Sequence, residues 1–308
     1  MSARLKIFIS VLTIAVMAIF ISNVQRYSAV FIKGVSIWAN NVLPTVLPFM
    51  LFSGFATKLG GVQLLSRKTT LCKALFGTPQ GVDWIFFLSL ICGYPVGAKL
   101  VAQQHKSGLD HDTCNKLVTF CSTASPVFIV GTVGAGYLQS TKSAIILLAS
   151  HLVASILNGL AYKNIFTSNC TKVHYSTQQE NAFSCVIESV NSILSVGALI
   201  ALFYTLCTMI CDLLPKWFNT NGLLATSFVL GLLEMTTGCI NICQITNTFT
   251  ATVLCCALVS FGGLCVIMQM MTFLGECKIK ISTIVLTKVT HCAFSTIICF
   301  VLSKLFAI

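Results

Sequence analysis

The amino-acid sequence predicts an all-α polytopic membrane protein, an inverted repeat with two re-entrant hairpins and two broken transmembrane helices. The first observation is composition: of 308 residues, 56% are hydrophobic and 9% are charged, and the mean hydropathy is +0.90. Soluble domains carry about 25% charged residues. The second observation is the presence of nine apolar segments. The third is the glycine, proline and polar residues that interrupt four of these segments.

The nine apolar segments are separated by polar connectors, of which the longest is 163–179. Arg4 and Lys6 stand at the start of the first segment. This segment is longer than the apolar region of a typical signal peptide and lacks a small-x-small cleavage site, so we expect a retained membrane span. The predicted segments are 5–24, 33–58, 83–104, 113–137, 142–162, 186–211, 221–247, 249–274 and 281–306.

Segment 83–104 carries the strongest interruption, with Gly93, Pro95, Gly97 and Lys99 inside seven residues. Glycine weakens a helix, and proline removes an amide donor and clashes with the preceding turn. The half after Lys99 is polar, so the segment is predicted to be a re-entrant hairpin. Hydrocarbon tolerates a broken helix only where protein or a water-filled cavity satisfies the backbone. The break therefore predicts a binding site.

The second half of the chain repeats the order of features in the first half. Three corresponding pairs lie 142, 138 and 140 residues apart: Pro95 and Thr237, Ser122 and Ser260, and His151 and His291. Chance is the alternative to a true repeat, since the halves share no long identical string. The predicted domains are an N-terminal transmembrane helix at 1–32, a first repeat at 33–162, a cytoplasmic linker at 163–185 and a second, inverted repeat at 186–308.

Basic residues predict the orientation. If the segments at 83–104 and 221–247 are re-entrant hairpins, the chain crosses the membrane seven times. Twelve of the nineteen lysines and arginines then lie on one side, among them Arg4, Lys68 and Lys73, and five lie on the other, among them Lys304. Positively charged loops stay in the cytoplasm. We therefore expect a bacterial cell-membrane protein with a cytoplasmic N-terminus and an extracytoplasmic C-terminus.

Glu234 is the single carboxylate far from any segment end, in the interrupted stretch 231–238. Acidic residues at membrane depth are costly and mark functional sites. It is interpreted as a ligand for a solute or cation at the tip of the second hairpin, and a hydrogen-bonded structural glutamate is the alternative. Helix N-termini at such breaks offer free amides to polar solutes. This arrangement is typical of secondary transporters.

Hydroxyl side chains before Pro126 either line the same site or bond to carbonyls of their own helix. Lys99 either belongs to the site or extends to the surface along its polar half-helix. Gly262 opens the fourth break or allows close helix packing. The predicted solute-binding residues are Gly93, Tyr94, Pro95, Gly97, Lys99, Ser122, Thr123, Ser125, Glu234, Thr236, Thr237 and Gly262.

Other classes of function find little support. The sixteen cysteines include no Cys-x-x-Cys pair and lie mostly inside apolar segments, where thiols pack as small hydrophobes. No metal site or enzyme motif of the His-Glu-x-x-His or Gly-x-Ser-x-Gly type occurs. The basic residues are scattered, which disfavours nucleic acid. His151 and His291 are expected as core histidines, with a proton relay as the alternative.

Four motifs occur in a specific order: Gly93–Lys99 (GYPVGAK), Ser125–Phe128 (SPVF), Gly231–Gly238 (GLLEMTTG) and Ser260–Gly263 (SFGG). Over about residues 35–305, the sequence resembles the YlbJ-type sporulation integral membrane proteins of spore-forming bacteria. These belong to the nucleoside-recognition, or Gate, domain group, which is similar to concentrative nucleoside transporters. The resemblance implies a role in spore formation and an inferred transport activity. The Ser-Thr-Ala-Ser stretch before Pro126 departs from the expected asparagine and leaves the solute open.

Two functions are weighed against each other. The first is a secondary transporter of a small polar, nucleoside-like solute, coupled to Na⁺ or H⁺ and without other cofactors. The second is a non-transporting scaffold in a sporulation assembly, favoured by the lack of a second deep carboxylate. Membrane lipid is the expected surrounding in both cases. A homo-oligomer or a complex with other sporulation membrane proteins fits either one.

Overall fold

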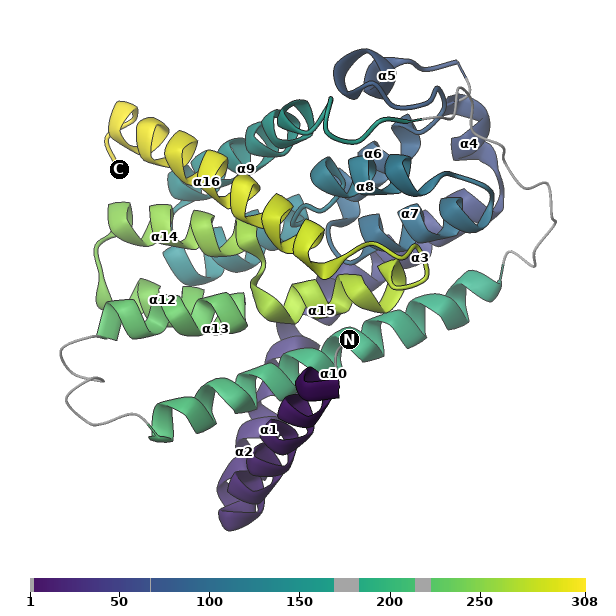
Figure 1. Cartoon of the computed structure of the whole chain (residues 1–308). Coiled ribbons are helices and arrows are strands. Elements are labelled where there is room, and N and C mark those ends of the chain that lie inside the picture. The colour runs from purple at the N-terminus through teal and green to yellow at the C-terminus, as the bar shows by residue number, and fades with distance from the viewer. Residues whose placement is uncertain (1–2, 67, 169–182, 214–222) are drawn as a thin grey trace.

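The computed structural model describes residues 3–66, 68–168, 183–213 and 223–308, and every regular element in them is a helix (Figure 1). Five helical stretches are long and apolar enough to cross a membrane: 24–58, 141–161, 184–213, 248–274 and 281–305. The predicted all-α, polytopic membrane protein is therefore confirmed. Most of the predicted linker at 163–185 lies outside the described residues.

The first half begins with an apolar helix and one long helical stretch, and then divides into shorter helices. Its elements are α1 (Ala3–Ser22), α2 (Val24–Ile37), η1 (Trp38–Val42), α3 (Leu43–Lys58), α4 (Gly61–Ser66), α5 (Leu71–Phe76), α6 (Asp83–Cys92), α7 (Val96–Lys106), α8 (His111–Phe120), η2 (Phe128–Leu138) and α9 (Thr141–Ala161). Helices α2, η1 and α3 follow each other without a gap, so the helix predicted at 33–58 begins nine residues earlier, at Val24. The predicted boundary at residue 32 falls inside α2.

The second half has the same order of long helix, helix pair, interrupted helix and long helix. Its elements are α10 (Ser184–Leu213), α12 (Leu223–Leu233), α13 (Met235–Ile245), α14 (Thr248–Phe261), α15 (Gly263–Leu274) and α16 (Ile281–Leu305). Helix α6 packs against α7, and α12 packs against α13. The backbone leaves the helical conformation at 93–95, 121–125, 234 and 262, so a break lies in or overlaps each predicted interruption, at 93–99, 122–126, 234–238 and 260–263.

The long helices α2–α3 and α10 pack against each other and run in opposite directions. Arg26, near the start of α2, forms an ion pair with Asp212, near the end of α10, at 2.6 Å. Lys58, at the end of α3, forms one with Glu188, near the start of α10, at 3.0 Å. From Arg26 to Lys58 along α2–α3, the contacting residue on α10 changes from Asp212 back to Glu188. The two helices are therefore antiparallel.

Helices α9 and α16 are also antiparallel neighbours. The Nζ of Lys142 donates to the carbonyl of Ala307 at 3.3 Å, and the Nδ2 of Asn158 donates to the carbonyl of Thr287 at 3.0 Å. The first contact joins the start of α9 to the end of α16, and the second joins the end of α9 to the first half of α16. Both pairs of long helices thus join one half of the chain to the other.

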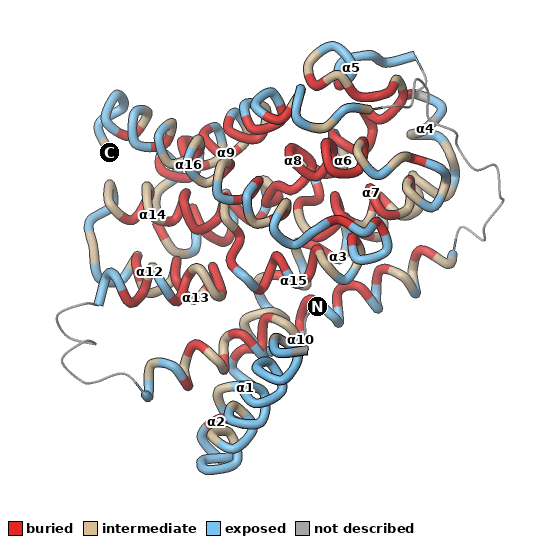
Figure 2. Tube along the Cα trace, viewed as in Figure 1, coloured by how far each residue is buried: buried red, intermediate tan, exposed pale blue. Residues whose placement is uncertain are grey.

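Burial differs among the helices (Figure 2). Helices α6, α8 and α14 are mostly buried, whereas α1 and the outward faces of α10 and α16 are exposed. The exposed side chains are large and apolar, such as Ile7, Phe8, Ile187 and Ile297, each more than 60% exposed. Large apolar side chains exposed in this way fit contact with lipid. Helices α6, α8 and α14 therefore form the interior of the molecule.

Candidate functional site

The first break joins α6 to α7 and is fastened to the unwound segment 121–125. The amide of Tyr94 donates to the carbonyl of Thr123 at 2.7 Å. Gly93 has a φ of +73°, a conformation that glycine adopts without strain, and a side chain there would overlap the backbone of Ser125. Gly97 lies so close to the carbonyl of Cys121 that a Cβ would overlap it. Glycines at these positions allow the two backbones to touch.

The second break joins α12 to α13 at a single residue, Glu234. Its backbone is extended, and its carboxylate accepts the amide of Thr236 at 3.0 Å and the amide of Thr237 at 2.7 Å. The hydroxyl of Thr237 adds a third hydrogen bond at 2.8 Å. Glu234 therefore caps the N-terminus of α13, where free amides and the helix dipole favour negative charge. The geometry thus contains the alternative role considered for Glu234, that of a hydrogen-bonded structural glutamate.

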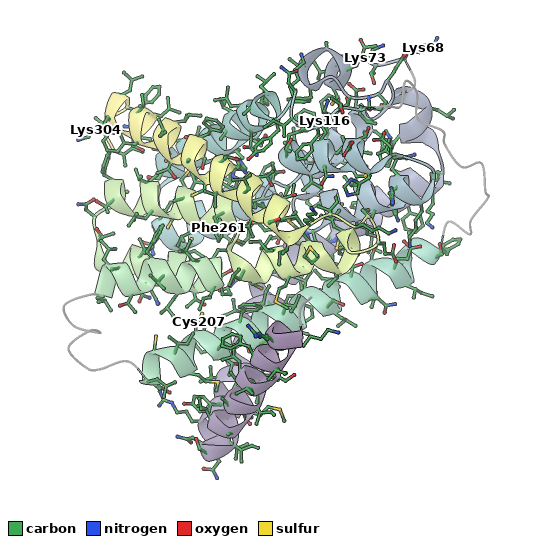
Figure 3. The ribbon with its side chains drawn as sticks, viewed as in Figure 1. Lys68, Lys73, Lys116, Cys207, Phe261 and Lys304 are labelled. Atoms are coloured by element: carbon green, nitrogen blue, oxygen red, sulfur yellow. The ribbon has the colours of Figure 1, made fainter. Side chains whose placement is uncertain are left out.

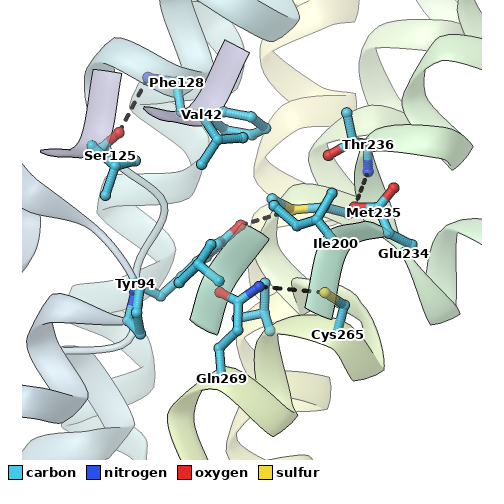
Figure 4. A pocket seen from close by; sticks show the side chains of 14 residues that line it. Val42, Tyr94, Ser125, Phe128, Ile200, Glu234, Met235, Thr236, Cys265 and Gln269 are labelled. Carbon is cyan, nitrogen blue, oxygen red and sulfur yellow. Dashed lines mark hydrogen bonds between the residues drawn. The ribbon is translucent and has the colours of Figure 1, made fainter. Parts of the chain in front are cut away.

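The structure brings the two breaks together (Figure 4). The Oη of Tyr94 lies 2.8 Å from the Sδ of Met235, and it donates to the carbonyl of Val259 at 3.3 Å. Tyr94 belongs to the first break, Met235 follows the second, and Val259 lies in α14 three residues before the break at Gly262. One tyrosine side chain thus joins three interrupted elements from both halves of the chain.

A pocket lies at this junction, with lining residues from both breaks and from the long helices around them. It is lined by Val42, Val46, Tyr94, Pro95, Ser125, Phe128, Val196, Ile200, Glu234, Met235, Thr236, Cys265, Val266 and Gln269. Its cavity volume of about 40 Å³ holds a few waters, at about 10–15 Å³ for each one. An apolar wall with a few convergent polar groups is typical of a small-molecule site. A molecule larger than a few waters would enter only after the breaks move apart.

Five of the twelve predicted site residues line the pocket: Tyr94, Pro95, Ser125, Glu234 and Thr236. The others support the breaks or lie elsewhere. The hydroxyl of Thr123 donates to the carbonyl of Ser89 at 3.1 Å, and that of Ser122 contacts the Sδ of Met270 at 3.0 Å. Thr237 serves the cap on Glu234, Gly93 and Gly97 allow close backbone approach, and Gly262 ends α14 with a φ of +85°.

Lys99 lies apart from the pocket. Its Nζ is 3.4 Å from a carboxylate oxygen of Glu188, the same residue that pairs with Lys58. Glu188 stands near the start of α10, where its side chain is 36% exposed. Lys99 therefore belongs to an ion-pair cluster that ties α7 to α3 and α10. Sequence spacing placed Lys99 next to the break, but the helix that follows Pro95 carries it away.

Gln269 is a pocket residue that the sequence reasoning missed. It is 4% exposed and its amide contacts the Sγ of Cys265 at 3.3 Å, one turn earlier on α15. A signal was present, because Gln269 is the one side-chain amide within the apolar stretch 249–274. A buried amide needs partners, and the pocket is where this one faces space (Figure 4).

Of the two core histidines, His151 fastens the broken elements to α9, and His291 joins α16 to α9. The amide of Ala124 donates to the Nε2 of His151 at 2.9 Å, and the Nδ1 of His151 lies 2.8 Å from the hydroxyl of Ser260. The Nε2 of His291 lies 3.0 Å from the carbonyl of His151. Because Nε2 of His151 accepts an N–H, that ring is neutral in this arrangement. Both histidines are buried and hydrogen-bonded, as expected for core residues.

No group of three or more His, Cys, Asp or Glu suited to a metal ion occurs among the described residues. The described cysteines are free thiols and most are buried, in agreement with the expected packing role. The polar atoms that converge on the pocket are therefore carboxylate, hydroxyl and amide groups. Groups of these kinds form hydrogen bonds with polar molecules.

Comparison with known proteins gives one match. A stretch of 149 residues, 48% of this chain, is 26% identical to the sporulation integral membrane protein YlbJ of Bacillus subtilis (strain 168). The aligned stretch spans 36% of the length of that protein. No family model and no solved structure matches the chain. The match supports the resemblance to the YlbJ type that the four motifs indicate.

Proposed function

We propose that this membrane protein moves a small polar, nucleoside-like solute across a bacterial cell membrane, with a role in spore formation. The observation that carries the proposal is the meeting of two chain breaks, one from each half, at a pocket lined by Tyr94 and Glu234. Broken helices that meet at a pocket are typical of secondary transporters. The sporulation role rests on the name of the YlbJ relative. The proposal includes no enzymatic step.

The proposed architecture is an inverted repeat in which α6–α7 and α12–α13 are re-entrant hairpins. Corresponding long helices run antiparallel, as Arg26 with Asp212 and Lys142 with Ala307 indicate. An inverted second half would place each of its helices opposite in direction to its counterpart. This support is independent of the motif order. It also agrees with the nucleoside-recognition, or Gate, resemblance and its likeness to concentrative nucleoside transporters.

The orientation proposed from charge has an N-terminus in the cytoplasm and a C-terminus outside. Figure 3 shows Lys68 and Lys73 toward the upper right of the molecule and Lys304 at its upper left, and this separation supports their assignment to different sides of the membrane. Reporter fusions at Ser176 and Ile308 test this orientation. We expect a cytoplasmic signal at 176 and an extracytoplasmic signal at 308. An extracytoplasmic signal at 176 contradicts the inverted repeat.

The pocket chemistry favours an uncharged, hydrogen-bonding solute. Glu234 already accepts three hydrogen bonds from its own helix, so its charge is largely compensated. Ser125, Thr236 and Gln269 add hydroxyl and amide groups that both donate and accept. Tyr94 offers an aromatic face to a planar ring. We propose that the solute contacts these groups after the breaks separate, since the closed pocket holds only a few waters.

Uptake into proteoliposomes, screened over nucleosides with dicarboxylates as the charged comparison, tests the transport proposal. We expect uptake of an uncharged nucleoside-like solute and a binding affinity about tenfold weaker or worse for Glu234→Gln. A charge-assisted hydrogen bond contributes roughly 1.5–3 kcal/mol. Glu276→Gln is the matched control, because Glu276 pairs with Lys106 at an exposed site. Unchanged binding in Glu234→Gln would remove Glu234 from the site.

The alternative function is a non-transporting scaffold in a sporulation assembly. One observation favours it: the carboxylate of Glu234 is satisfied within α13, which leaves it a capping role without any solute. One result distinguishes the transporter from the scaffold. If Glu234→Gln abolishes spore formation while no solute is taken up by the parent protein, the scaffold is the better account.

A further inference from the structure

Lys288 is a fully buried lysine of α16 beside the unwound segment 121–125. Its side chain is among the largest fully buried ones, with 1% of the residue exposed. Its Nζ donates to the carbonyl of Ser122 at 2.7 Å and stands 4.9 Å from the ring centre of Tyr94. Within the described part of the chain, no carboxylate lies within ion-pairing distance of this ammonium group.

The place that this ammonium occupies is suited to a cation. Helix α8 ends at Phe120. The carbonyl of Ser122 therefore has no following helical turn whose amides could donate to it. The C-terminal end of a helix carries partial negative charge. The face of Tyr94 adds the negative side of an aromatic quadrupole. In carriers built from broken helices, unwound carbonyls and helix C-termini at such breaks coordinate Na⁺ or H⁺.

The neighbouring groups supply no opposite charge. On α9, His151 is held neutral at Nε2 by the amide of Ala124. On α16 itself, His291 and Cys292 are the nearest titratable groups, and His291 bonds to a backbone carbonyl. From the first break comes the Tyr94 ring. Backbone oxygen and an aromatic face therefore stabilise this charge, as they would stabilise a bound metal cation.

We propose that the ammonium of Lys288 is the resident cation of this break, so that the molecule binds no sodium ion there. Resting on the transport function proposed above, this means that solute movement uses no sodium ion bound at this break. Lys288 also fixes two parts of the pocket wall at once. It binds the segment that leads to Ser125 through Ser122, and it lies against Tyr94.

Chemical rescue tests the proposal without any knowledge of the solute. Lys288→Ala removes the atoms from Cγ to Nζ, which n-propylammonium replaces atom for atom. We expect n-propylammonium to raise the unfolding temperature of purified Lys288→Ala by about 2–4 °C. The uncharged 1-propanol should not reproduce this rise. Lys99→Ala is the matched control: the Glu188 carboxylate that its ammonium faced keeps Lys58 as an ion-pair partner at 3.0 Å, so neither compound should stabilise this variant.

A second measurement uses the unmodified protein and so does not depend on how the variant folds. The unfolding temperature of the wild type should be the same in sodium chloride and in choline chloride at equal ionic strength. A sodium-specific stabilisation of the wild type would overturn the proposal, and so would equal rescue of Lys288→Ala by 1-propanol. Both readouts are independent of uptake. A failed transport assay together with a positive rescue would therefore contradict the transport function and still support Lys288 as the cation at this break.

Discussion

The two chain breaks that meet at the pocket satisfy their free backbone amides in different ways. At the first break, the amide of Tyr94 bonds to the carbonyl of Thr123 in another element. At the second break, the amides of Thr236 and Thr237 bond to the carboxylate of Glu234, a residue of the same helix pair. The first break is thus fastened to its surroundings by backbone contacts, and the second is closed by its own side chain.

Glycine packing follows the same division. Gly97 of the first pair lies against the backbone of Cys121 in the unwound segment, whereas Gly238 of the second pair lies against Gly231 in its own partner helix. The second pair still touches the interruption between α14 and α15, because a Cβ on Gly263 would lie 3.0 Å from the carbonyl of Leu233. The first pair is nevertheless tied more closely to its neighbour. We therefore expect the second pair to be the part that moves when the pocket opens.

The largest effect is expected from Gly97→Ala. A Cβ at this position overlaps the carbonyl of Cys121 and crowds the Cβ of Ser89, and a backbone carbonyl has no rotamer to escape into. We expect a loss of about 3 kcal/mol in the free energy of unfolding, at the upper end of overpacking costs. Thermal unfolding of the purified protein measures it. Gly131→Ala is the control, because a Cβ there meets nothing within 4 Å.

This result bears directly on the comparison. If Gly97→Ala were as stable as Gly131→Ala, the first break would not be fastened to the unwound segment. The two breaks would then not differ in how they are held in place.

A smaller effect is expected from Glu234→Ala. The substitution removes the cap of α13 and leaves the amides of Thr236 and Thr237 without their acceptor. Loss of such a cap costs about 1–2 kcal/mol of stability. Glu234→Gln keeps one acceptor oxygen and should lose less stability than Glu234→Ala, while weakening solute binding. Equal unfolding temperatures for Glu234→Ala and the wild type would show that the second break is held by packing alone.

The smallest effect is expected from Lys99→Ala. Glu188 keeps Lys58 as an ion-pair partner at 3.0 Å, and its side chain is partly exposed. Partly exposed ion pairs contribute about 1 kcal/mol or less. We expect a change of that size in unfolding free energy and no change in solute binding, measured by thermal unfolding and uptake. Weakened solute binding in this variant would show that Lys99 belongs to the binding site.

The positions of the breaks were predictable because they depend on local chemistry. Gly93 and Pro95 interrupt a helix wherever they occur, and Gly262 does so through its left-handed backbone. Glu234 was recognisable because an acid inside an apolar segment demands partners. For Lys99 two alternatives stayed open, and the structure places it outside the pocket, because its neighbour across space, Glu188, lies 89 residues away. The local spacing of residues does not indicate ion pairs between positions so far apart in the sequence.

By itself, the sequence determined that the chain is a helical membrane protein with four interruptions, because hydropathy and helix-breaking residues act within a few turns. The tertiary structure alone decided that Tyr94 meets Met235, that Gln269 faces the pocket and that Lys288 serves the carbonyl of Ser122. These contacts join residues 141 to 166 positions apart or depend on which face of a helix is enclosed. Packing of one half against the other selects them, since a buried polar group has to find its partner wherever the fold supplies one.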